Sequence, residues 1–302
     1  MKPTTKETSI EKAKHIPALA MRINVSVIIK KALEFHQQSL SIAKEIGNKV
    51  TESKAYTNIG NAYKCLDDYK KAIEFHQQSL SIAKGTGDKG TEGKAYTNLG
   101  NASHSLGDYK KAIEFHQQSL SITKEIGNKG SEGKAYTSLG LTSHSLGDYK
   151  KAIEFYQQSL SIAKEIGDKD TEGKAYDNLG NTYRCLGDCK KAIEFHQQSL
   201  SIAKEIGNKG SEGAAYTNLG IAYYSLGDYE KAIEFHQQSL SIAKEIGSKG
   251  SEGKAYVNLG LASHSLGDYK KAIEFHQQSL SIAKEIRDKD TEGKAYDNLG
   301  SV

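Results

Sequence analysis

One phrase recurs along this chain at a fixed spacing of 40 residues. The stretch KKAIEFHQQSLSIAKEIG begins at Lys190, and each near-copy of it has a phenylalanine at the same position of the repeat. These phenylalanines are Phe35, Phe75, Phe115, Phe155, Phe195, Phe235 and Phe275. A strict period of this length predicts a solenoid, because each unit can stack only on its neighbours.

The period divides the chain into units. Six complete units occupy residues 51–290. We expect residues 1–29 to form a degenerate N-terminal segment that serves as a capping helix, and residues 30–50 to be a partial repeat made of a second helix. Residues 291–302 correspond to the truncated first helix of a seventh unit. A solenoid usually finishes with a polar capping helix, so this end suggests a fragment, a truncated gene model or an end that a partner covers.

Each unit has the pattern of two helices. In the stretch SEGKAYTSLGLTSHSLGD, Ser131 is the predicted N-cap, and Tyr136 and Leu139 fall on one face of a first helix. Gly147 supplies a left-handed end, and Asp148 caps the second helix that follows. The sequence therefore predicts an all-α protein.

The composition is that of an elongated, hydrophilic protein. Apolar residues make up 37% and charged residues 26% of the chain, and the net charge of +4 is spread over every unit. This charge pattern, without any aromatic and basic recognition motif, argues against a nucleic-acid partner. The most apolar early stretch, IPALAMRINVSVII, is interrupted by Arg22 and Asn24 and is too short to span a membrane.

The three cysteines indicate a reducing compartment. Cys65, Cys185 and Cys189 are an odd, sparse set that lacks the CxxC spacing of a metal or redox site. A redox pair between Cys185 and Cys189 is a weaker alternative. Since no signal-peptide pattern precedes residue 26, we expect a cytoplasmic protein.

The stretch AYTNLGNASHSLGDYKKAIEFHQQSL, residues 95–120, resembles the tetratricopeptide repeat. The characteristic positions of that family correspond to Tyr96, Leu99, Gly100, Ala112, His116 and Ser119. The longer 40-residue form resembles the LGN/Pins G-protein signalling modulators and the TPR-CHAT proteins. The resemblance implies a right-handed superhelical α-solenoid of antiparallel helix pairs, whose first helices line a concave inner wall.

The substitutions between units gather on the first helix. One variable site, which we call site five, holds Thr57, Thr97, Thr137, Asp177, Thr217, Val257 and Asp297. A second, site nine, holds Asn61, Asn101, Leu141, Asn181, Ile221 and Leu261. Residues four apart lie on one stripe of a helix, so this pattern predicts a constant scaffold with a varied groove. Recent duplication, with differences not yet sorted by function, is the alternative.

Two nearly constant polar sites share this wall. The Asn ladder consists of Asn58, Asn98, Asn178, Asn218, Asn258 and Asn298, with Ser138 as the exception. The Lys ladder consists of Lys54, Lys94, Lys134, Lys174, Lys254 and Lys294, with Ala214 as the exception. A carboxamide both donates and accepts hydrogen bonds, so it can pair with a peptide unit of an extended chain. Resemblance to LGN/Pins and kinesin light chains implies this role for the Asn ladder.

The histidines of the second helix correspond to the packing site between the two helices. They are His76, His116, His196, His236 and His276, with Tyr156 in the remaining unit. The tyrosine favours packing over metal binding. A zinc site shared by His104 and His144 is a weaker alternative, because neighbouring helix axes lie about 8–10 Å apart.

The sequence therefore predicts a scaffold that binds an extended, acidic peptide of a protein partner, with Leu141, Ile221 and Leu261 as apolar pockets. No catalytic grouping or cofactor motif stands apart from the repetition, so we expect neither an enzyme nor a cofactor. A G-protein or cell-polarity adaptor at the cell cortex is an alternative; its GoLoco segments would lie beyond Val302, as would a CHAT region. A structural spacer that self-associates through its C-terminal end is another.

Overall fold

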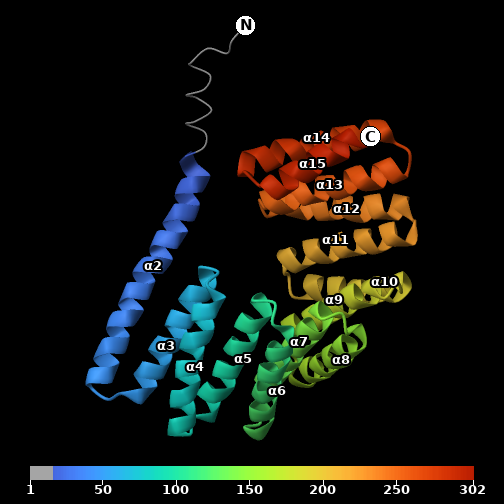
Figure 1. The fold of residues 1–302 in the computed structure, drawn as a ribbon. Coiled ribbons are helices and arrows are strands. Elements are labelled where there is room, and N and C mark those ends of the chain that lie inside the picture. Colours follow the sequence, from blue (N-terminus) through green and yellow to red (C-terminus); the bar gives the residue numbers. More distant parts are fainter. Residues whose placement is uncertain (1–15) are drawn as a thin grey trace, which may run out of the picture. The chain divides into compact units, whose positions relative to one another are not determined.

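The computed structural model describes residues 16–302 of the chain, and the side chains of residues 26–302. This part contains fourteen helices and no strand (Figure 1). It divides at Thr142 into two compact units. Since every secondary-structure element of the described part is a helix, the predicted all-α class is confirmed.

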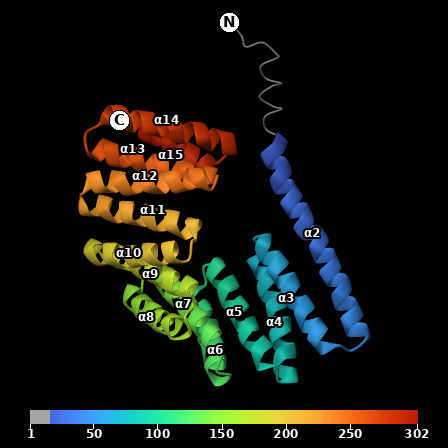
Figure 2. The same ribbon diagram turned by 180° about the vertical axis from the view of Figure 1, so that it is seen from behind.

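The first unit contains the blue to green helices of Figures 1 and 2. They are α2 (Ile16–Glu45), α3 (Lys49–Cys65), α4 (Tyr69–Thr86), α5 (Lys89–Ser105), α6 (Tyr109–Glu125) and most of α7 (Lys129–Ser145). From α3 onward, odd-numbered helices are the first helices of the repeats and even-numbered helices the second. Consecutive helices pack on one another from α2 to α6, as expected for a stack of helix pairs.

The second unit contains the helices from α8 to the C-terminus. They are α8 (Tyr149–Ile166), α9 (Lys169–Cys185), α10 (Cys189–Glu205), α11 (Lys209–Leu226), α12 (Tyr229–Glu245), α13 (Lys249–Ser265), α14 (Tyr269–Ile286) and α15 (Lys289–Gly300). Consecutive helices pack here as well, and the first helices α9, α11, α13 and α15 also contact one another in sequence. The first helices thus form one layer, which confirms the solenoid of antiparallel helix pairs.

The helix ends follow the predicted glycine and aspartate pattern with one correction. Gly147 has a φ of +85°, and Asp148 accepts a hydrogen bond from the backbone of Lys151 at the start of α8. However, α7 begins at Lys129, and Asn128 accepts from the backbone N–H of Ser131, at 2.9 Å. Ser131 is therefore not the N-cap. The cap lies earlier because the left-handed glycine directly before Asn128 ends the preceding helix, so no linker intervenes.

The predicted packing role of the second-helix histidines is confirmed. His76, His116, His196, His236 and His276 are each at most 2% exposed, and Tyr156 at the same site is 1% exposed. Each of these histidines lies against a glycine of its own first helix; for Gly60 and His76 an added Cβ would stand 2.5 Å from the ring. Glycine and histidine thus let the two helices of a pair approach closely.

The first described element is a single long helix. α2 runs without a break from Ile16 to Glu45, so it includes residues of both the predicted N-terminal segment, 1–29, and the predicted partial repeat, 30–50. No glycine or proline lies between Pro17 and Gly47, so nothing in the sequence interrupts the helix. Residues 1–15 of the predicted N-terminal segment lie outside the described residues. Within residues 16–302, no helix is both long and apolar enough to cross a membrane.

Candidate functional site

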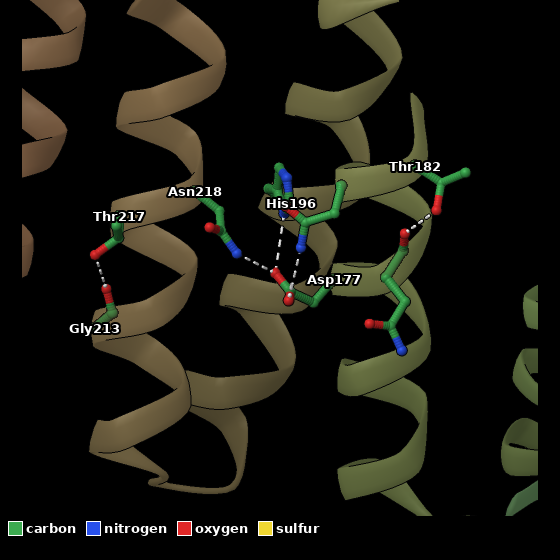
Figure 3. A network of polar contacts seen from close by, with 8 residues as sticks. Asp177, Thr182, His196, Gly213, Thr217 and Asn218 are labelled. Carbon is green, nitrogen blue, oxygen red and sulfur yellow. Dashed lines mark hydrogen bonds and ion pairs between the residues drawn. The ribbon is translucent and has the colours of Figure 1, made fainter. Parts of the chain in front are cut away.

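Asp177 joins three helices of the second unit through its carboxylate (Figure 3). Its Oδ1 accepts a hydrogen bond of 2.7 Å from Asn218 Nδ2 on α11 and lies 3.1 Å from His196 Nδ1 on α10. Its Oδ2 accepts a hydrogen bond of 3.2 Å from Asn181 Nδ2 on α9. Site five, site nine and the Asn ladder therefore meet here on adjacent first helices.

The repeat explains this meeting. Asn218 stands one repeat and one residue after Asp177, so the same offset relates the two sites on every pair of neighbouring first helices. An equal offset of 41 residues relates Tyr224 and Ser265, whose hydroxyls lie 2.9 Å apart between α11 and α13. The first helices of the second unit thus present their variable sites along one shared face.

The Asn ladder is not buried between the layers. Asn58 is exposed, and the other five members are half-buried. Within the described part of the chain, the side chains of Asn98 and Asn258 have no hydrogen-bond partner, whereas that of Asn218 donates to Asp177. The ladder therefore contains both free and engaged carboxamides.

Two furrows lie between consecutive first helices of the second unit. The first separates α9 from α11, with Lys174, Asp177 and Ala214 on its walls and Ile202 of α10 on its floor. The second separates α11 from α13. Ala214, Thr217, Asn218 and Lys254 form its walls, and Ile242 of α12 lies on its floor.

Ala214 belongs to both furrows, at the place where other units carry a lysine of the Lys ladder. Each furrow has polar walls over an apolar floor. This chemistry suits one side chain of an extended peptide whose backbone runs across the walls.

Site five determines whether the wall carries a charge. Thr217 turns inward: its hydroxyl donates to the backbone oxygen of Gly213 at 3.0 Å and lies 2.6 Å from Ser239 Oγ. Asp177 at the equivalent place turns its carboxylate toward Asn218 instead. The sequence showed Asp177 as a variable residue of site five but did not place it among the candidate binding residues. Its partner Asn218 lies 41 positions away in the sequence, so no local pattern indicates the contact.

The Lys ladder is exposed, and two of its members are neutralised. Lys174 Nζ lies 2.5 Å from Asp170 Oδ2, and Lys294 Nζ lies 2.7 Å from Asp290 Oδ2, each across one helical turn. Lys94, Lys134 and Lys254 lack this aspartate, because a glycine stands four residues before each of them. These three lysines are therefore the stronger candidates for an acidic ligand.

The apolar residues of site nine are accessible to different extents. Leu141 is 45% exposed, Leu261 is 37% exposed, and Ile221 is half-buried. In the same site Asn61 is exposed and Asn101 is half-buried. The variable site therefore offers side chains of different polarity to a ligand.

The remaining histidines and cysteines show no shared site. The ring of His104 lies 5.2 Å from that of Tyr109, and the ring of His144 lies 5.1 Å from that of Tyr149. Cys65, Cys185 and Cys189 are all free thiols. Among the residues whose placement the structure describes, no three histidine, cysteine or acidic side chains are grouped so as to hold a metal ion.

Comparison with known families identifies the repeat. A family model for the tetratricopeptide repeat matches residues 29–85, 91–165 and 167–245, which together exceed half of the chain. The chain belongs to the tetratricopeptide repeat family. A second tetratricopeptide model matches residues 255–290. No curated protein matches the sequence.

Solved structures share the fold of this tetratricopeptide protein. BtubC from P. vanneervenii has a TM-score of 0.67 at 21% identity, over 72% of this chain and 92% of that one. The signal-transduction ATPase PH0952 from Pyrococcus horikoshii, which has a tetratricopeptide repeat sensor, gives 0.73 at 21% identity. That match covers 96% of this chain and 45% of the ATPase. A putative kinesin light chain from Podosopora anserina with nearly identical repeats gives 0.55 at 20% identity, over 63% and 95%.

As a tetratricopeptide protein, the chain is a scaffold for protein interactions. The structure and the family together give this general role.

Proposed function

We propose that this scaffold binds an extended, acidic segment of a partner protein along the face formed by its first helices. The observation that supports the proposal is the contact of Asn218 with Asp177 across two first helices. Within the second unit, it joins members of the Asn ladder, site five and site nine into one surface that is partly open to solvent.

The side-chain carboxamides of the Asn ladder bind the backbone of the partner's peptide. The free amides of Asn98 and Asn258 can each donate to a peptide carbonyl and accept from a peptide N–H. Lys94, Lys134 and Lys254 add positive charge beside the ladder, and such charges favour acidic side chains through screened attraction. Leu141, Ile221 and Leu261 would give specificity by contacting apolar side chains of the partner.

The spacing of the helices sets the length of the ligand. Packed helix axes lie about 8–10 Å apart, and an extended chain covers about 3.3 Å per residue. Each first helix therefore faces about three residues of the peptide. A segment of about 12 residues would reach about four first helices.

The proposal is tested with peptides of about 12 residues, selected from a random library on the purified protein and labelled for fluorescence anisotropy. Asn178→Ala with Asn258→Ala, both in the second unit, should weaken binding about tenfold or more, because two backbone-pairing groups within reach of one peptide are lost. Neither side-chain amide has a hydrogen-bond partner among residues 26–302, so helicity should not change. Gln117→Ala with Gln237→Ala is the matched control, since these exposed carboxamides belong to the second helices.

Two results would overturn the proposal. One is equal affinity of the asparagine pair variant and the wild type for every selected peptide. The other is selection of peptides without enrichment of aspartate and glutamate, which would remove the role of the Lys ladder. The G-protein or cell-polarity role that the sequence resemblance implies stays a prediction, as does the cytoplasmic location.

A further inference from the structure

Helix α2 carries an apolar face that nothing covers within the described residues. Phe35 and Ile42 on this face are each 58% exposed. In five later units the equivalent isoleucine is 5–7% exposed, and Ile82 in the remaining unit is half-buried; the five are Ile122, Ile162, Ile202, Ile242 and Ile282. The same sequence is therefore buried in those units and open in α2.

The first helix of the same repeat unit covers this face elsewhere. In the pair α5 and α6, the rings of Tyr96 and Phe115 lie 6.2 Å apart. A Cβ added to Gly93 would stand 3.2 Å from Ile122 Cγ2, so glycine there lets the isoleucine pack on the helix backbone. The same pairings recur in α9 with α10 and in α11 with α12.

Helix α15 presents the reciprocal face. Tyr296 is 51% exposed, whereas the equivalent Tyr96 and Tyr216 are 8% and 9% exposed. A Cβ added to Gly293 or Gly300 would meet nothing within 4 Å. The two glycines that receive a second helix in the intact pairs therefore lie open in α15.

We propose that α15 of one copy of this chain packs on α2 of a second copy, and so completes a tetratricopeptide pair between the two molecules. The pairing places Tyr296 on Phe35, Gly293 on Ile42 and Gly300 on His36. This proposal goes beyond peptide binding and uses other residues, so either function can fail without the other.

The repeat fixes the register of this contact. Within a repeat, His116 packs on Gly100 and lies 16 positions after it. By the same spacing, the histidine that packs on Gly300 would have the number 316. His36 lies 280 positions before number 316, which is seven repeats of 40 residues. Phe35 and Ile42 likewise lie 280 positions before the numbers at which the repeat would place the partners of Tyr296 and Gly293. All three pairs therefore form at one register, and the second molecule continues the period of the first.

Such an interface joins the α15 face of one copy to the α2 face of another. At the two ends of the assembly, one α2 face and one α15 face stay free. The interface does not close by itself, so assemblies grow by addition of further copies. We expect the mean mass, measured by sedimentation or light scattering, to rise with concentration over about a hundredfold range. A constant monomer mass over that range would contradict the proposal.

Two variants test the two surfaces separately. Ile42→Glu places a charge on the open face of α2, and Gly300→Val places a side chain where His36 would pack. Both sites are open in the single chain, so folding should be retained. Each variant should weaken association about tenfold or more. Ile126→Glu and Gly85→Val are the controls, because Ile126 is 43% exposed and a Cβ on Gly85 meets nothing.

A mixture of the two variants distinguishes this contact from other modes. Ile42→Glu retains an intact α15, and Gly300→Val retains an intact α2, so the mixture should form dimers of one copy of each and stop there. If α2 paired with α2 of another copy, Gly300→Val would associate like the wild type and the mixture would not restore pairing. That result would overturn the proposal.

Discussion

The ring of His116 packs on the backbone of Gly100, where an added Cβ would stand 2.4 Å from His116 Cε1. The ring cannot move aside, because His116 is 1% exposed. The contact recurs in four further pairs of helices, with distances of 2.3–2.6 Å to the same ring atom. It determines how closely the two helices of a repeat approach.

Replacing this glycine should loosen the pair. In Gly100→Ala the methyl group overlaps the imidazole, which costs about 1–3 kcal/mol, while alanine returns about 1 kcal/mol of helix propensity. We expect a lower urea midpoint. Gly85→Ala is the control, because its Cβ would meet nothing and the midpoint should stay equal or rise. A urea midpoint of Gly100→Ala above that of the wild type would contradict the close packing of Gly100 on His116.

The buried histidines should make the protein sensitive to acid. Burial lowers the pKa of His76, His116 and His236 from 6.5 to about 4. Because the folded state holds the proton less tightly than the unfolded chain, this stability is present above about pH 6.5 and is lost as the pH falls toward 4. From about pH 7 to about pH 5, each histidine should cost about 2 kcal/mol.

The chain supplies its own control for this effect. His116→Tyr copies Tyr156, which fills the same site and is 1% exposed. This variant should lose less stability than the wild type between neutral and acidic urea titrations, and Tyr156→His should lose more. If all three proteins showed the same pH dependence, the buried histidines would not be its source.

The sequence predicted the fold from its period and predicted the packing of His116 from the family pattern. It could not predict the contact of Asp177 with Asn218, because that contact depends on how far neighbouring first helices are displaced along one another. Ser131 was assigned as a cap because a serine before an apolar helix is typical, but Asn128 lies directly after the left-handed Gly127 and takes that role. Ends and lateral register follow from tertiary packing, which local patterns describe weakly.

Asp177 should oppose the binding of acidic peptides. Its carboxylate adds negative charge to the first furrow and occupies an amide hydrogen of Asn218. Asp177→Thr copies Thr217, whose hydroxyl bonds inward to Gly213. We expect tighter binding of a selected acidic peptide by roughly threefold to tenfold, measured by fluorescence anisotropy. Weaker binding would show that Asp177 contributes to recognition instead.

Lys254 should contribute a salt-dependent part of the affinity. It is exposed on the wall of the second furrow. Lys254→Gln should weaken binding of an acidic peptide by roughly threefold at low salt and have less effect at high salt, where the charge is screened. Lys110→Gln, on an exposed site of a second helix, is the control. An equal loss at both salt concentrations would point to a contact other than charge.

The position of the bound peptide tests the central claim most directly. A selected acidic peptide that carries a photoreactive group is crosslinked to the protein, and the attached residues are identified by mass spectrometry. The account predicts crosslinks on consecutive first helices, such as α9, α11 and α13, near Asn178, Asn218 and Asn258. Crosslinks confined to the second helices, such as α6 and α12, would contradict it.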